Sequence, residues 1–164
     1  MHALVSFARR LGSFSRRRHV TVGELPVGET ARAARTLLEL RPAFQSADAL
    51  VARIDDVQRA GGYRLLGSFE DDSDADAAGV AGFRIVEFLP WGRSLYVDDF
   101  ITAEGHRGRG HADALFDWLL AEARREGCGE LHLDSAVGPE REDAHRFYFR
   151  HGMRIAAYHF SRKV

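Results

Sequence analysis

The stretch LYVDDFITAEGHRGRGHA, residues 95–112, decides how this chain folds. Residues 95–102 combine apolar and β-favouring side chains, which predicts a strand. Residues 103–109 are polar and contain two glycines and two arginines, and a helix begins at Gly110. The first N–H groups of a helix lack intrahelical partners, the helix dipole adds positive charge there, and glycine lets a phosphate approach the backbone. The stretch therefore predicts a site for a phosphorylated cofactor.

Length and composition describe an ordinary globular protein. The chain has 164 residues, of which 45% are hydrophobic and 29% are charged, and its formal net charge is −1. Such a charge creates no field that would recruit nucleic acid or a membrane surface, and no apolar run approaches the length of a membrane span. The single cysteine, Cys128, cannot form an internal disulfide, which fits a reducing compartment. We therefore expect a cytoplasmic protein with no nucleic-acid or membrane partner.

The start of the chain differs in composition from the rest. Residues 1–19 contain five arginines and no acidic residue. An Arg- and Ser-rich start without acids resembles an organelle transit peptide, whereas its apolar pieces are too short for a secretory signal. The alternative, which we prefer, is a basic extension that need not be ordered. We therefore expect an N-terminal extension over residues 1–18 and one domain over residues 19–164.

Hydrophobic periodicity divides this domain into strands and helices. Strands are expected over 19–23, 63–69, 80–89, 95–102, 130–134 and 155–160, and helices over 29–40, 46–60, 110–126 and 141–151. The helix from Gly110 has the clearest apolar stripe, which consists of Ala112, Leu115, Phe116, Leu119, Leu120 and Ala123. The order predicts a mixed sheet with a central antiparallel hairpin, followed by a βαβ unit that carries the phosphate site. We expect a single α/β (α+β) domain.

Two other phosphate-binding motifs were compared with the loop. A dinucleotide-binding fold also places a glycine-rich loop between a strand and a helix. Gly108 and Gly110 fit its G-x-G-x-x-G motif, but Asp113 stands where the third glycine is needed, and repeated βαβ units are missing. A Walker loop is excluded because the chain contains no Gly-Lys-Ser/Thr.

Patterns that would indicate a metal site are weak. The acidic turn at residues 70–76 lacks the spaced glycine and the final glutamate of a calcium loop. His145, His151 and His159 do not have the spacing of metal ligands. We therefore expect a solvated hairpin tip at residues 70–76 and no metal site.

Two motifs resemble a known family. RGRGHA at residues 107–112 matches the R/Q-x-x-G-x-G/A signature of the GNAT superfamily of N-acetyltransferases, and it lies between a strand and a helix as in that family. AHRFYFRHGM at residues 144–153 resembles the family's A-x-x-hydrophobic-Tyr-x-x-x-Gly-aromatic segment, and its AHRFY run is also similar to aminoalkylphosphonate acetyltransferases. The resemblance implies a mixed sheet with antiparallel N-terminal strands, a splayed parallel pair at the cofactor site, and flanking helices.

The resemblance also implies a cofactor and its contacts. Acetyl-CoA would be the donor, and a primary amine in a small molecule or a peptide would be the acceptor. In the family the signature loop holds the CoA pyrophosphate, while the preceding strand pairs with pantetheine and polarises the thioester carbonyl. The matching residues of this chain are Phe100, Ile101, Thr102, Arg107, Gly108, Arg109, Gly110, His111 and Ala112. We expect the side chain of His111 to point outward and to take no part in catalysis.

Attack on a thioester requires a neutral amine. An alkyl amine has a pKa of about 10.4, so its deprotonation at pH 7 costs about 4–5 kcal/mol. A base or a desolvated site must supply this free energy. The candidate bases are Asp98, Asp99 and Asp134. Strand alternation predicts that Asp98 and Asp99 lie on opposite faces, so that at most one of them looks into the cleft.

The departing thiolate requires a proton, and Tyr148 matches the tyrosine general acid of the family. Proton transfer from a phenol (pKa about 10) to a thiolate (about 8.5) costs about 2 kcal/mol, so this tyrosine would act largely through a hydrogen bond. The chain departs from the family pattern at Arg141, where asparagine is common, and at Met153, where an aromatic residue is usual.

The resemblance fits two further functions besides acetylation of a small amine or peptide. One is a protein acetyltransferase that acts on lysine or on an N-terminus, and the other is a non-catalytic acyl-CoA-binding module. It also allows a homodimer.

Overall fold

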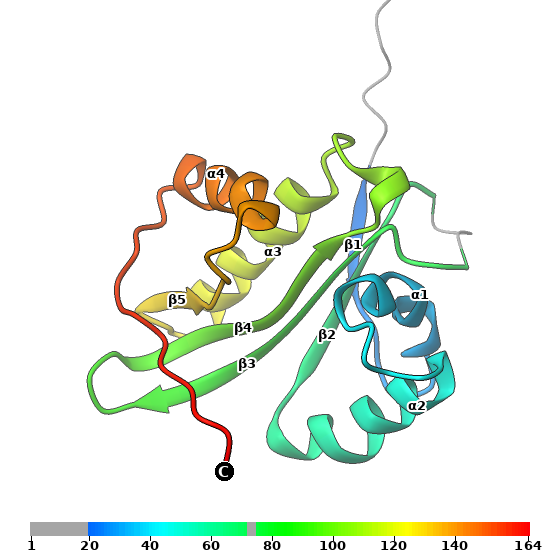
Figure 1. Ribbon diagram of the computed structural model, residues 1–164, viewed down its shortest axis with the longest axis horizontal. Coiled ribbons are helices and arrows are strands. Elements are labelled where there is room, and N and C mark those ends of the chain that lie inside the picture. Colours follow the sequence, from blue (N-terminus) through cyan, green and yellow to red (C-terminus); the bar gives the residue numbers. More distant parts are fainter. Residues whose placement is uncertain (1–19, 72–74) are drawn as a thin grey trace, which may run out of the picture.

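A mixed sheet of five strands lies between two layers of helices (Figure 1). The computed structural model describes residues 20–71 and 75–164, so the predicted extension at 1–18 and the centre of the acidic turn lie outside the described residues. The strands lie in the order β1-β2-β3-β4-β5. Strands β1 to β4 pair with one another in antiparallel fashion, and β5 is parallel to β4. The predicted mixed sheet and fold class are confirmed.

The described elements correspond to the predicted ones except at the C-terminal end. In chain order they are β1 (Thr21–Glu24), α1 (Ala31–Leu40), α2 (Ala47–Ala52), η1 (Arg53–Gln58), η2 (Arg59–Gly61), β2 (Arg64–Phe69), β3 (Gly79–Phe88), β4 (Gly92–Thr102), η3 (Glu104–His106), α3 (His111–Arg125), β5 (Glu130–Leu133), η4 (Pro139–Arg141) and α4 (Glu142–Arg150). Here η1 is a turn of π-helix and the other η elements are 3-10 helices. Within the described ranges, no helix is long and apolar enough to span a membrane.

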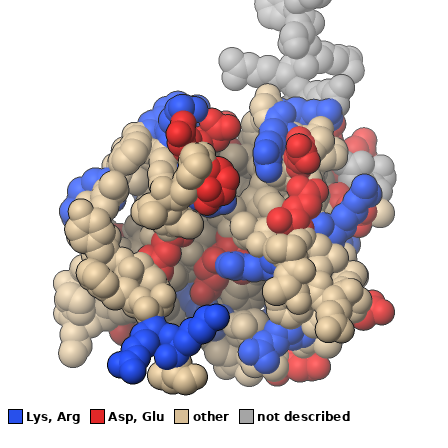
Figure 2. Space-filling view, in the orientation of Figure 1, with Lys and Arg blue, Asp and Glu red and all other residues tan. Residues whose placement is uncertain are grey.

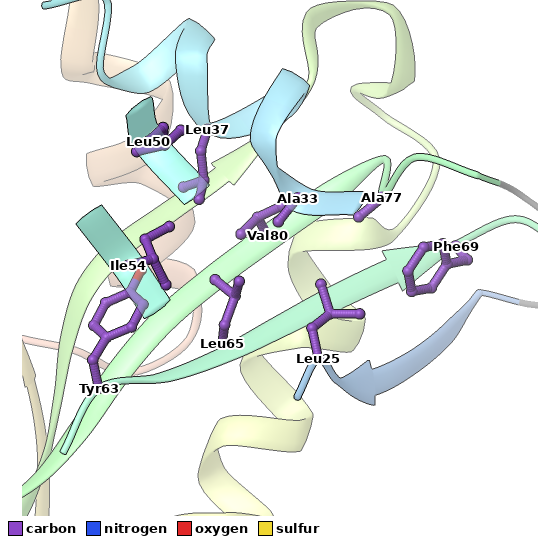
Figure 3. Close-up of a cluster of buried hydrophobic side chains, with 10 residues drawn as sticks. All are labelled: Leu25, Ala33, Leu37, Leu50, Ile54, Tyr63, Leu65, Phe69, Ala77 and Val80. Carbon is purple, nitrogen blue, oxygen red and sulfur yellow. The ribbon is translucent and has the colours of Figure 1, made fainter. Parts of the chain in front are cut away.

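The sheet has an apolar core on each face. Alternation along β2 sends Leu65 toward α1 and α2 and Leu66 toward α3, and both side chains are fully buried. Figure 3 shows side chains from α1, α2, β2 and β3 that point toward one another in the first core. The second core joins β2, β3 and β4 to the apolar stripe of α3, including Leu115 and Leu119. Both helical layers are therefore fixed to the sheet by burial of apolar surface.

The predicted strand at residues 155–160 is wrong. Residues 153–164 contain no strand, and the side chains of Ile155, Tyr158 and Phe160 are exposed. Their β-favouring composition reflects preference for a pleated, half-buried surface, and this segment pairs with no edge of the described sheet.

We predict that Leu115→Ala lowers the free energy of unfolding by about 2–5 kcal/mol, because it leaves a cavity between α3 and the sheet. The same substitution at Leu89, which is fully exposed at the β3–β4 turn, should change it by less than about 0.5 kcal/mol. Urea unfolding monitored by circular dichroism measures the free energy of unfolding of both variants. Equal losses in the two variants would contradict the assigned core.

Candidate active site

The pairing between β4 and the edge strand β5 ends partway along β4. The two strands pair from Ser94 with Glu130 to Val97 with Leu133, where β5 ends. Residues 98–102 of β4 continue along β3 alone, and Figure 1 shows β5 ending partway along β4. The structure thus places Phe100, Ile101 and Thr102 on a strand segment whose second edge has no partner strand among the described residues. Such an edge presents N–H and C=O groups to an extended ligand.

The loop after β4 leads into the first turn of α3. Gly108 (φ 74°) and Gly110 (φ 93°) adopt the left-handed conformation that glycine tolerates best, and α3 begins at His111. The side chains of Arg107 and Arg109 are exposed, and Ala112 lies in the first turn. First-turn N–H groups have no intrahelical partner. This phosphate loop, residues 107–112, therefore has the backbone geometry of an anion site.

The predicted orientation of His111 is wrong. Its side chain is almost fully buried, and its Nδ1 lies 3.0 Å from Ser68 Oγ on β2. Burial is the main cause that lowers the pKa of this histidine. His111 lies four residues before Leu115, so it extends the buried stripe of α3 by one turn. That spacing was the sequence signal for its burial.

A first cavity, of about 240 Å³, lies where β4 and β5 separate. Asp98 and Phe100 of β4, Asp134 after β5, and Tyr148 of α4 line it. Three of the four predicted catalytic side chains are therefore brought together beside the free edge of β4.

Tyr148 is the most enclosed of these groups. Burial raises the pKa of its phenol, and the neighbouring Arg141 guanidinium opposes that rise. Arg141 lines the same cavity and lies 3.4 Å from Ser135 Oγ. The residue that departs from the family pattern thus supplies a positive charge close to the tyrosine.

The prediction that Asp98 and Asp99 lie on opposite faces of β4 is wrong. Asp99 pairs with Gly82 and Val97 pairs with Phe83, so Asp98 is an extra residue of β4 in a β-bulge. Both carboxylates line a second cavity, also of about 240 Å³, between β4 and the α1–α2 layer. The bulge interrupts the alternation on which the prediction rested.

Each of the two carboxylates is held by an arginine. Arg41 Nε donates to Asp99 Oδ1 at 2.7 Å, and Tyr63 Oη donates to Asp99 Oδ2 at 2.8 Å. Arg84 Nε donates to Asp98 Oδ2 at 3.0 Å. Burial is the main cause that raises the pKa of Asp98, and Arg84 opposes it. These partners are distant from the two aspartates along the chain, because Arg41 follows α1, Arg84 lies on β3 and Tyr63 precedes β2. No local sequence pattern therefore indicated them.

Asp98 and Arg41 line both cavities. Figure 2 shows acidic and basic side chains together in the hollow between the α4 side and the α1–α2 side of the molecule. Asp99 lines only the second cavity. Asp98 is therefore the carboxylate at the junction of the two spaces.

Asp134 is more exposed than the other candidates. Its side chain retains 54% of its accessible surface, His159 Nδ1 lies 3.2 Å from its Oδ2, and the Tyr96 hydroxyl hydrogen-bonds to it. Asp134 lines the first cavity only.

Comparisons with known proteins identify relatives of this chain. The family model of the acetyltransferase (GNAT) family matches residues 33–153. YhdJ, an uncharacterised N-acetyltransferase of Bacillus subtilis (strain 168), is 36% identical over 74 residues, which are 44% of this chain and 51% of YhdJ. The match thus spans about half the length of that relative.

Solved structures share the fold. Ribosomal-protein-alanine N-acetyltransferase from Brucella melitensis biovar Abortus 2308 has a TM-score of 0.73 at 20% identity, over 89% of this chain and 100% of that one. AAC(6')-Iy, in complex with the bisubstrate analogue CoA-S-monomethyl-acetylneamine, has a TM-score of 0.72 at 18% identity, over 89% of this chain and 99% of that one. At such identities the likeness shows the fold, whereas the family match covers most of the sequence. The chain belongs to the GNAT family of acetyltransferases.

Proposed function

We propose that this chain transfers an acetyl group from acetyl-CoA to a primary amine by direct attack of the amine on the thioester. The observation that carries the proposal is the cavity beside the free edge of β4, in which Asp98 and Tyr148 face the same space. Membership of the GNAT family supports the acetyl transfer. The structural neighbour AAC(6')-Iy binds a CoA-based bisubstrate analogue, which supports the choice of donor.

The donor would lie along three consecutive features. Its pyrophosphate would accept hydrogen bonds from the N–H groups of the phosphate loop. Its pantetheine would pair with the edge at residues 100–102, as an added strand does. The thioester would then reach the first cavity, between Asp98 and Tyr148.

The acceptor would enter through the second cavity. Its volume of about 240 Å³ suits a small-molecule amine or one side chain of a peptide. Asp98 lines both cavities, so an amine bound beside it would lie near both the carboxylate and the thioester. We also propose a cytoplasmic location, which the free thiol of Cys128 supports.

Proton transfers would follow from the electrostatics of the two side chains. A carboxylate whose pKa is raised by burial accepts a proton more readily than an ordinary aspartate, so Asp98 is suited to remove the amine proton. The Tyr148 hydroxyl would donate a hydrogen bond to the departing thiolate, and Arg141 would stabilise the negative charge shared between them. The nucleophile is the amine itself, and no acyl-enzyme is needed.

Binding of acetyl-CoA tests the donor. We predict that Gly110→Ala weakens it about tenfold, because a Cβ at φ 93° costs about 1–2 kcal/mol and distorts the phosphate loop. Gly105→Ala is the matched control, since Gly105 precedes the same loop with an ordinary φ and open space around it. Isothermal titration calorimetry measures both. Absence of any acetyl-CoA binding by the unmodified chain would overturn the proposed function.

The variant Tyr148→Phe tests the proposed role of the Tyr148 hydroxyl as the general acid. We predict that kcat falls by about 10- to 100-fold while the KM for acetyl-CoA changes little, because the hydroxyl acts on the thiolate that forms during reaction. Release of CoA thiol, measured across a panel of amines, gives both constants. Tyr158→Phe makes the same change at an exposed tyrosine and should leave kcat unaltered. Unchanged kcat in Tyr148→Phe would remove this tyrosine from the mechanism.

The pH dependence of kcat/KM tests the base. Asp98 must be ionised to act as the base, and its pKa is raised. As the pH is lowered, kcat/KM should therefore begin to fall at a higher pH than it would with an aspartate of ordinary pKa. In Asp98→Asn this decline should move toward the pKa of the free amine. In Asp99→Asn it should stay in place, because Asp99 is held by Tyr63 and Arg41. A decline that moves in Asp99→Asn and stays in place in Asp98→Asn would identify Asp99 as the general base instead.

A further inference from the structure

Three side chains from separate parts of the chain converge behind the phosphate loop. Glu70 follows β2, His106 ends η3, and His111 begins α3. One potential ligand atom from each lies within 4.8 Å of the others. Glu70 Oε1 is 3.2 Å from His106 Nδ1 and 3.7 Å from His111 Nε2. Around a tetrahedral zinc ion with bonds of about 2.0–2.1 Å, ligand atoms lie roughly 3.3 Å apart, and the two distances from Glu70 Oε1 to the histidines are close to this value.

The imidazole of His111 has an unsatisfied nitrogen that points into this cluster. His111 is 1% exposed, and its Nε2 has no hydrogen-bond partner in the described part of the chain. At 3.7 Å, Glu70 Oε1 is too distant for a hydrogen bond. A buried polar atom without a partner costs about 1–3 kcal/mol. A cation bound beside the Glu70 carboxylate would give Nε2 the partner that it lacks.

The second nitrogen of His111 is already oriented. Its Nδ1 lies 3.0 Å from Ser68 Oγ, and when Nδ1 donates to that oxygen, Nε2 carries the lone pair that a metal requires. Metal-binding histidines almost always have such an outer partner, which fixes the ring and its tautomer. Burial lowers the pKa of His111 and so favours the neutral form that binds metals.

We infer that Glu70, His106 and His111 bind one divalent transition-metal ion of the zinc type. Two imidazoles and one carboxylate suit zinc, cobalt or nickel, whereas calcium and magnesium prefer sites made of oxygen ligands. Three protein ligands leave a fourth position for water or an anion. The sequence pattern did not indicate this set of residues, because its members are distant along the chain or belong to the loop assigned to phosphate.

Arg109 also contacts this cluster. Its Nη1 lies 2.7 Å from the same Glu70 oxygen, and its side chain is 41% exposed. An exposed guanidinium can move toward solvent or toward the loop when an ion takes that oxygen. Metal binding would therefore release Arg109 and add positive charge beside the phosphate loop.

Metal titrations of the full chain, freed of metal by a chelator, test the site. Calorimetry should show one zinc ion bound per chain, and cobalt should give visible absorption bands of a protein-bound ion. Glu70→Gln and His106→Ala should each weaken zinc at least about 100-fold, because loss of even an outer partner costs 10- to 100-fold. His106 is partly exposed, so its replacement should leave the fold intact, as circular dichroism can show.

Two further variants separate the site from adventitious binding. Ser68→Ala should weaken zinc about 10-fold or more, because it removes the partner of Nδ1 without touching a ligand. His159→Ala removes an exposed histidine elsewhere and should bind zinc as the unmodified chain does. Absence of stoichiometric zinc and cobalt binding, or binding unaltered by Glu70→Gln and His106→Ala, would overturn the inference. The cluster would then be a network of ion pairs only.

Discussion

The separation of β4 from β5 after Val97 is the constraint on which the rest of the site depends. Asp98 is an extra residue between the pairs formed by Val97 and Asp99, and such a bulge bends a strand and increases its twist. Because β5 ends at Leu133, residues 98–102 keep only β3 as a neighbour among the described strands. The end of β5 thus leaves an edge of β4 free beside the first cavity, and the bulge turns Asp98 toward the second cavity.

Polar contacts hold this bulge in place. Tyr63 reaches Asp99 across β3 at Gly82, where an added Cβ would lie 1.8 Å from the tyrosine hydroxyl. Arg41 bonds to the Asp99 carboxylate and also, at 3.0 Å, to the Asp98 carbonyl oxygen. Removing one member of such a network leaves its partners unsatisfied in a partly buried place. Residues that would never touch the cofactor therefore determine the geometry of the strand that would bind it.

The sequence predicted the parts of the site whose signals are local. The glycines of residues 107–112 and the apolar stripe after them are patterns that lie within a short stretch of sequence. The structure has both where they were expected. The bulge at Asp98 depends on register between two strands, and the meeting of Glu70 with His106 depends on tertiary packing. The C-terminal segment, residues 155–160, has the composition of a strand but no edge to join. Whether a segment forms a strand depends on a free edge elsewhere in the sheet, and a short segment of sequence does not reveal such an edge.

The ion pairs of the second cavity bear on how an amine would react there. Arg84 matches the charge of Asp98 and Arg41 that of Asp99, so the paired groups contribute little net charge. In the proposed reaction, an entering ammonium would lose hydration without gaining an unpaired carboxylate, and desolvation would lower its pKa. The same pairing that weakens capture of the cation therefore favours the neutral amine, which is the reactive form. Asp98, at the junction with the first cavity, is placed to accept the proton as that form is produced.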